Sequence, residues 1–124
     1  MQFNLDKNEK YVLFKLNEQK LNTLIAADMK SELLILNTQG VKNIILDLSE
    51  TKFCDSSGLS AILTGNRLCR NVEGSFILTG VNEHVNKLIH ISQLDQVLTL
   101  IPTVDEAIEY VFMDEIERDI SDTK

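Results

Sequence analysis

One short run in the middle of the chain has residue types that suit phosphate chemistry, because two serine hydroxyls follow an aspartate: Asp55, Ser56, Ser57, Gly58 and Leu59. It lies between a stretch that predicts a buried strand, 43–49, and a pattern that predicts a helix, 57–71. Asp and Ser are preferred at helix starts, where a side-chain oxygen accepts a hydrogen bond from a free backbone N–H. The same free N–H groups and the helix dipole also stabilise an anion. The run therefore indicates either a plain helix cap or a place for a phosphate.

The elements on either side of this run determine how it is presented. The continuous apolar segment 44–46 is typical of parallel strands that are covered on both faces. Because ligands and partners tend to meet open α/β sheets at the carboxyl ends of strands, we expect the Ser56 hydroxyl to be exposed. Gly58 lacks a side chain, so we expect a partner backbone to approach closely there. The helix after the run has apolar residues at amphipathic spacing: Leu59, Ile62, Leu63 and Cys69.

The rest of the chain alternates strand-like and helix-like segments. Segments 3–5 and 11–16, joined by a polar turn, predict an N-terminal hairpin. Further helices and strands are predicted at 22–37, 76–79, 82–91, 97–101 and from Thr103 onward. The first of these helices has Leu24, Ile25, Met29, Leu33 and Leu36 on or near one face. The alternation predicts a single α/β domain, in which an antiparallel hairpin is followed by βα units in a mixed β-sheet with helices packed on it.

Composition and charge limit the function classes. The 124 residues are 44% hydrophobic and 25% charged, as in one folded domain, and no apolar stretch is long enough to insert into a membrane. We expect a cytoplasmic protein with a domain at 1–113 and an acidic extension at 114–124. For this extension, a solvated helix or a frayed end is favoured over a specific docking segment. From Thr103 onward, eight acidic residues accompany two basic ones. Without a basic stripe, direct nucleic-acid binding is not expected.

The cysteines and histidines show no metal-binding pattern. Cys54 and Cys69 have no CxxC motif around them and are predicted to be small buried hydrophobic residues. His84 and His90 are six residues apart, which does not place them on one helical face as the four-residue spacing of zinc ligands does. Neither histidine has a sequence relation to Ser56 as a base, and the G-x-S-x-G motif of hydrolases is absent. We therefore expect no metal, no cofactor and no catalytic residue.

Segments 45–49 and 53–59 together resemble the signature of STAS domains, the family of bacterial anti-sigma factor antagonists and sulfate-transporter tails. The resemblance covers roughly residues 3 to 112. In phosphorylatable members the serine directly after the aspartate accepts the phosphate, which implies Ser56 here. The second half of the chain is also similar to the family, in Gly80-Val81-Asn82 followed by Val85, Leu88, Ile89 and Leu94.

The resemblance implies a regulator of sigma-factor-dependent transcription rather than an enzyme. Without phosphate, an anti-sigma factor antagonist binds an anti-sigma factor that has serine kinase activity, and so frees a sigma factor. Phosphorylation of Ser56 by that kinase ends the binding, and a PP2C-type serine phosphatase resets the cycle. The partner-binding loop is then expected to consist of Asp55, Ser56, Ser57, Gly58 and Leu59.

Two departures from the family pattern and two alternatives remain. Ser60 follows Leu59 where a small Gly is frequent in the family, a change that a helix is expected to tolerate or prefer. Many antagonists have a Gly and an Asp after the second strand, whereas 16–22 has no Gly and places Asn22 at the Asp position, which makes Asn22 a candidate partner contact. The first alternative is a scaffold subunit of a lipid-transport ATPase or of a stressosome-like complex, in which the loop docks a partner without phosphate control. The second is a small-molecule-binding domain of the transporter-tail kind.

Overall fold

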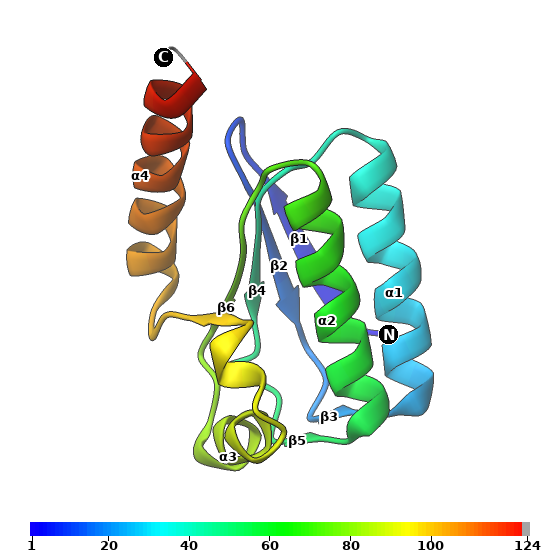
Figure 1. Ribbon diagram of the computed structural model, residues 1–124. Coiled ribbons are helices and arrows are strands. Elements are labelled where there is room, and N and C mark those ends of the chain that lie inside the picture. The colour runs from blue at the N-terminus through cyan, green and yellow to red at the C-terminus, as the bar shows by residue number, and fades with distance from the viewer. Residues whose placement is uncertain (123–124) are drawn as a thin grey trace.

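A five-stranded mixed sheet forms the centre of the fold (Figure 1). This computed structural model describes residues 1–122, with side chains as far as Ile120. β1 and β2 pair antiparallel and the later pairs are parallel, which confirms the predicted mixed sheet with the hairpin first. In their order across the sheet, the strands are β1 (Phe3–Lys7), β2 (Val12–Leu16), β4 (Ile44–Asp47), β6 (Phe76–Thr79) and β7 (Thr99–Leu100).

Helices cover both faces of this sheet. Figure 1 shows α1 and α2 side by side on one face and α4 on the other. Within residues 1–122, no helix is both long enough and apolar enough to cross a lipid bilayer. The α-helices of the described chain are α1 (Thr23–Thr38), α2 (Ser56–Asn71), α3 (Glu83–Ile91) and α4 (Val104–Asp122).

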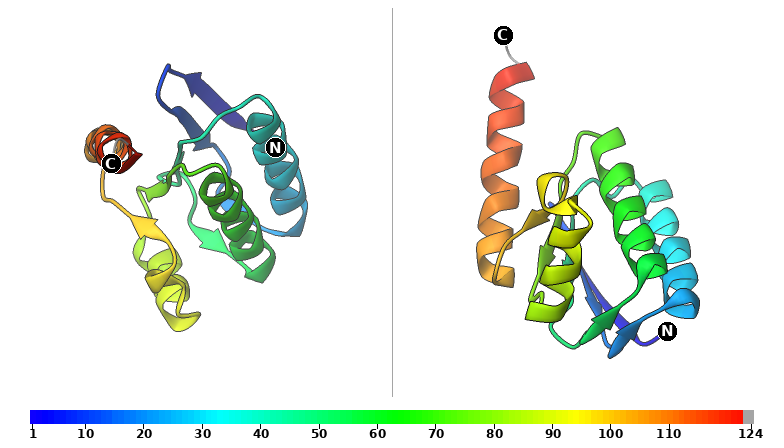
Figure 2. Two further views of the ribbon diagram at one scale, coloured as in Figure 1. Left: turned by 45° about the horizontal axis from the view of Figure 1, so that its top comes forward. Right: turned by 60° about the horizontal axis from the view of Figure 1, so that its bottom comes forward.

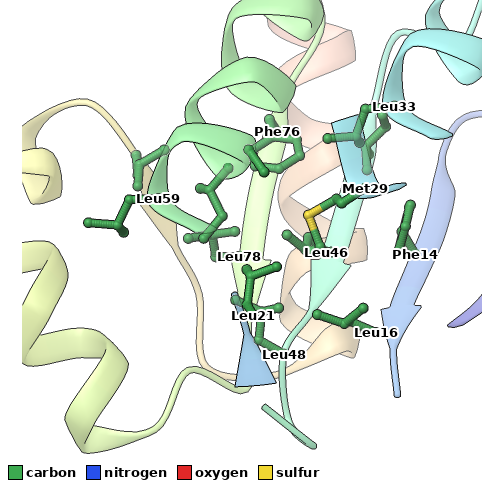
Figure 3. Close-up of a cluster of buried hydrophobic side chains, with 14 of the residues drawn as sticks. Phe14, Leu16, Leu21, Met29, Leu33, Leu46, Leu48, Leu59, Phe76 and Leu78 are labelled. Atoms are coloured by element: carbon green, nitrogen blue, oxygen red, sulfur yellow. The ribbon is translucent and has the colours of Figure 1, made fainter. Parts of the chain in front are cut away.

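Two apolar layers hold the helices to the sheet. Because successive side chains of a strand point to opposite faces, Leu46 belongs to the layer under α1 and α2, and Ile45 belongs to the layer under α4. Figure 3 shows the larger layer, in which side chains from the sheet meet those of α1 and α2. Burial of both faces accounts for the unbroken apolar segment 44–46. The smaller layer consists of Ile45, Ile77, Ala107 and Val111.

Two features of the fold differ from the sequence prediction. A second, parallel sheet joins β3 (Lys20–Leu21) to β5 (Phe53–Cys54), and strands of two residues have no periodicity from which to predict them. The strand predicted at 97–101 is shortened to β7, because a 3-10 turn at Leu94–Gln96 draws the next two N–H groups back to the Leu94 carbonyl.

Helix α4 continues past residue 113 without a break, and specific contacts hold its middle part. Ser75 Oγ donates to Asp114 at 2.6 Å, and Arg118 Nε donates to the same carboxylate at 2.8 Å. Buried Asn43 donates to Glu115 at 2.8 Å. Burial acts to raise the pKa of Asp114, but the hydrogen bonds from Ser75 and Arg118 outweigh it, and the pKa is lowered. The segment 114–124 is thus helical to Asp122, and its last two residues lie outside the described chain.

Candidate functional site

The predicted loop lies where β5 passes directly into α2. Asp55 is the N-cap, since its Oδ1 accepts a hydrogen bond from Gly58 N at 3.0 Å. Ser56 and Ser57 therefore occupy the first turn of α2, where backbone N–H groups have no partner within the helix. Asp55 and Ser56 are exposed, and Ser57 is half-buried. The cap and the exposure of the Ser56 hydroxyl, both predicted from the sequence, are confirmed.

Gly58 is required by packing inside the chain. A Cβ at this position would lie 2.6 Å from both Cys54 Sγ and Leu21 O, and 2.8 Å from Leu21 Cγ. The expectation that Gly58 leaves room for a partner backbone is wrong, because β3 and β5 already occupy that space. Leu59 is also buried, with 7% of its surface exposed. Gly58 and Leu59 therefore support the loop from beneath, and the three residues before them form its outer surface.

The start of α1 is built in the same way and lies beside the start of α2. Asn22 follows β3, and its Oδ1 accepts a hydrogen bond from Ile25 N at 3.2 Å, so Asn22 is the N-cap of α1. The parallel pairing of β3 with β5 brings the two helix starts together, as the right-hand view of Figure 2 shows. Thr23 Oγ1 lies 3.2 Å from Ser57 Oγ. The exposed Asn22 and Ser56 thus belong to one edge of the molecule.

Charges around Ser56 act on a phosphate in opposite directions. The N-termini of α1 and α2 both favour an anion through their free N–H groups and dipoles. Lys30 of α1 lines a shallow groove that also contains Ser56 and Ser57. The exposed carboxylate of Asp55 repels an added negative charge. We expect a phosphate here to alter the surface charge strongly and the fold only slightly.

The exposure of two apolar side chains at the same edge was not predicted from the sequence. Phe53 is 51% exposed, and its ring lies edge-on to that of His84 with 5.4 Å between ring centroids. Leu24 is 78% exposed, although the sequence analysis placed it on the apolar face of α1. That interpretation was wrong, because Leu24 precedes the buried Ala26 by two residues and therefore lies on the other side of the helix. The spacing of Leu24 from Met29, Leu33 and Leu36 in the sequence could have shown that Leu24 lies off the buried side of the helix.

The two cysteines are buried free thiols, as predicted. Burial raises the pKa of Cys54 to about 12, and the charge of Asp55 adds to this effect. Burial likewise raises the pKa of Cys69 to about 12. Because the thiolate is the reactive form, these neutral thiols act as packing groups. Within residues 1–122, no three His, Cys, Asp or Glu side chains are grouped so that they could hold a metal ion.

Among known protein families, residues 2–107 match the STAS domain, and the chain belongs to that family. A Thermotoga neapolitana protein named "Putative anti-sigma factor antagonist TM1081 homolog" is 33% identical over 73 residues. The alignment covers 59% of this chain and 65% of that relative, so the chain spans a little less than two thirds of the relative's length.

Solved structures align over most of the chain. The Thermotoga maritima protein TM1081, which carries the same description, superposes with a TM-score of 0.80 at 27% identity, covering 88% of this chain and 93% of the other. The anti-sigma factor antagonist SpoIIAA in its unphosphorylated form gives 0.76 at 26% identity, covering 89% and 96%. Phosphorylated SpoIIAA from Bacillus gives 0.70 at 26% identity, covering 89% and 99%. The predicted family and fold are confirmed.

Proposed function

We propose that this chain is an anti-sigma factor antagonist that is switched at Ser56. Without phosphate it binds an anti-sigma factor with serine kinase activity and frees a sigma factor. Phosphorylated on Ser56 by that kinase, it dissociates, and a PP2C-type serine phosphatase restores it. The observation that carries the proposal is the exposed Ser56 hydroxyl in the first turn of α2, directly after the capping Asp55. Similarity to SpoIIAA, solved both with and without phosphate, supports it.

The surface around Ser56 suits a protein partner. Leu24 and Phe53 present exposed apolar area at the same edge, and apolar side chains that become buried on binding form the core of protein interfaces. A phosphate adds a charge of about −1.5 to −2 at pH 7. An unpaired charge buried in an interface costs about 2–5 kcal/mol. At about 1.4 kcal/mol per tenfold, the complex weakens by about thirtyfold to several thousandfold.

The free chain tolerates the same phosphate. The two helix starts and Lys30 favour the added charge, while Asp55 opposes it. The cap itself uses the Asp55 side chain, so a group on Ser56 Oγ leaves the Asp55–Gly58 hydrogen bond in place. The proposed switch therefore acts through interface charge and not through unfolding of the loop.

In this proposal the chain is a substrate and not a catalyst. ATP binds to the kinase partner, so the chain needs no cofactor of its own. Its effect on transcription passes through proteins in the cytoplasm, since the net charge of −7 disfavours contact with nucleic acid.

The test is a titration of the partner kinase, taken from the same organism, against the wild-type chain and matched variants by calorimetry. Ser56→Asp is expected to weaken binding at least about thirtyfold. Ser56→Ala and Ser31→Asp, the second an exposed serine of α1, are expected to keep the wild-type affinity. In parallel, mass spectrometry of the chain from its own cells should find a phosphate on Ser56 whose occupancy changes between growth and stress.

A constitutive scaffold is the second candidate, and the exposure of Leu24 and Phe53 favours it because apolar docking needs no phosphate. It predicts that Ser56→Asp binds the partner as tightly as wild type, while Phe53→Ser loses the interaction. It also predicts an unmodified Ser56 under every growth condition. That combination of results would replace the switch with a scaffold.

A further inference from the structure

Helix α4 has apolar side chains on two opposite sides. On the inner side, Ala107 and Val111 are fully buried against Ile45 and Ile77 of the sheet. A helix at the surface of a single domain needs only one such side, with polar residues opposite it. The sequence of α4 does not follow that pattern, because its outer side is not uniformly polar.

The outer face of α4 consists of Phe112, Met113 and Ile116, which are 42%, 58% and 52% exposed. Ile116 lies three residues after Met113 and four after Phe112, so the helix brings the three side chains together. Figure 2 shows α4 end-on in its left view, with the sheet on one side and no other described element against the opposite side. At its edge, Phe112 meets the ring of Tyr11 at 6.4 Å between centroids, which extends the apolar area toward β2.

Acidic side chains surround this outer face. In the part of α4 whose side chains are described, the basic residue is Arg118. It donates hydrogen bonds to Asp114 and to the Gly74 carbonyl, on the inner side of the helix. A second copy of this chain would bring like charges together, and an anionic membrane would be repelled in the same way. Among residues 104–120 of the helix, the exposed acidic side chains are Asp105, Glu106, Glu109, Glu117 and Asp119.

We propose that the outer face of α4 docks a basic amphipathic helix of a partner protein. The apolar side of that helix covers Met113 and Ile116. Its Lys or Arg residues pair with carboxylates one helical turn before and one turn after Met113, Glu109 and Glu117. Helices recognise one another in this way through apolar anchors at three- and four-residue spacing. The anchorage of α4 by Asn43 and Ser75 keeps the docking face rigid. The proposal does not depend on Ser56.

The first test uses the full chain and two labelled synthetic peptides of equal length, with leucine on one helical side and either lysine or glutamate elsewhere. By fluorescence anisotropy, the lysine peptide is expected to bind and the glutamate peptide is not. Met113→Ser with Ile116→Ser should weaken binding at least tenfold, as should Glu109→Lys with Glu117→Lys. The matched control, Leu34→Ser with Ile35→Ser on α1, removes side chains of similar exposure, 49% and 46%, and should leave the affinity unchanged.

The proposal would be overturned if the α1 control lost as much affinity as the α4 variants. It would also be overturned if the glutamate peptide bound as tightly as the lysine peptide, or if the lysine peptide did not bind the wild-type chain. Circular dichroism and melting curves establish that each variant is folded. The second test places a photo-crosslinking phenylalanine analogue at Met113, or at Leu34 as control, in cells of the source organism. A crosslink from position 113 to a basic amphipathic segment of another protein supports the proposal. A crosslink to a second copy, to lipid or to an acidic segment, or a yield no higher than at position 34, contradicts it.

Discussion

Replacing Gly58 with alanine tests whether the Ser56 loop is held by packing on β3 and β5. The added methyl group would lie 2.6 Å from Cys54 Sγ and from Leu21 O, whereas carbon atoms in good contact lie about 3.5–4.0 Å apart. Leu21 O belongs to the backbone of β3, so it can move only with that strand. An extra methyl group in a packed interior costs about 1–3 kcal/mol. The contact at 2.6 Å with a backbone atom places this cost in the upper part of that range, about 2–3 kcal/mol. Because the helix propensity of alanine returns about 1 kcal/mol, we expect a net loss of about 1–2 kcal/mol.

Urea unfolding followed by circular dichroism measures this loss. Ser60→Ala, at an exposed position of the same helix, measures the propensity effect alone and is expected to be neutral or slightly stabilising. In a Cys54→Ala background, Gly58→Ala should cost less, because one of the two atoms at 2.6 Å is gone. If Gly58→Ala is as stable as wild type, or if its cost is the same with and without Cys54, the steric reasoning is refuted.

Two further predictions concern titratable groups. Asp114→Asn is expected to lower the unfolding free energy by about 1 kcal/mol at pH 7, because the pair with Arg118 is partly exposed, while the exposed Asp119→Asn changes little. Since folding lowers the pKa of Asp114, its contribution to stability is present above the ordinary pKa of 3.8 and is lost in more acidic solution. If wild type and Asp114→Asn still differed in unfolding free energy in acid, the ionised Asp114 would not be the cause. Cys54 and Cys69, each with a pKa raised to about 12, should react with a thiol reagent at pH 8 only as the chain unfolds. Fast labelling of both thiols in the folded chain would show that they are accessible.

Most of the fold could be predicted because its long elements have strong periodicity. Helix α1 and strand β6 were located to within about a residue, since burial of one side or of both faces determines the apolar spacing. β3 and β5 could not be predicted, because each pairs over two residues with a segment far away in the sequence. The same holds for the anchorage of α4, which depends on Asn43 and Ser75 meeting its side chains after folding.

In the candidate site too, features that depend on local contacts could be predicted, and features that depend on distant contacts could not. The caps at Asn22 and Asp55 were predictable, because a cap joins residues only three positions apart. The reason for Gly58 was not, since the atoms that exclude a side chain there belong to Leu21 and Cys54. The exposure of Phe53 depends likewise on how the second sheet lies against α3, which local sequence does not specify.

Backbone hydrogen bonds of the second sheet hold the Ser56 loop in place before any partner arrives. Lys52 N and Phe53 N both donate to Gln19 O, at 2.8 and 3.0 Å, and Asp55 N donates to Leu21 O at 3.3 Å. A surface that is already ordered loses little conformational entropy on binding, so collision and orientation should limit association, at about 10⁵–10⁷ M⁻¹ s⁻¹. A charge added at this edge then acts mainly on the lifetime of a complex. In the proposed switch, the rate at which the chain exchanges one partner for another should therefore be set by dissociation and not by rearrangement of the loop.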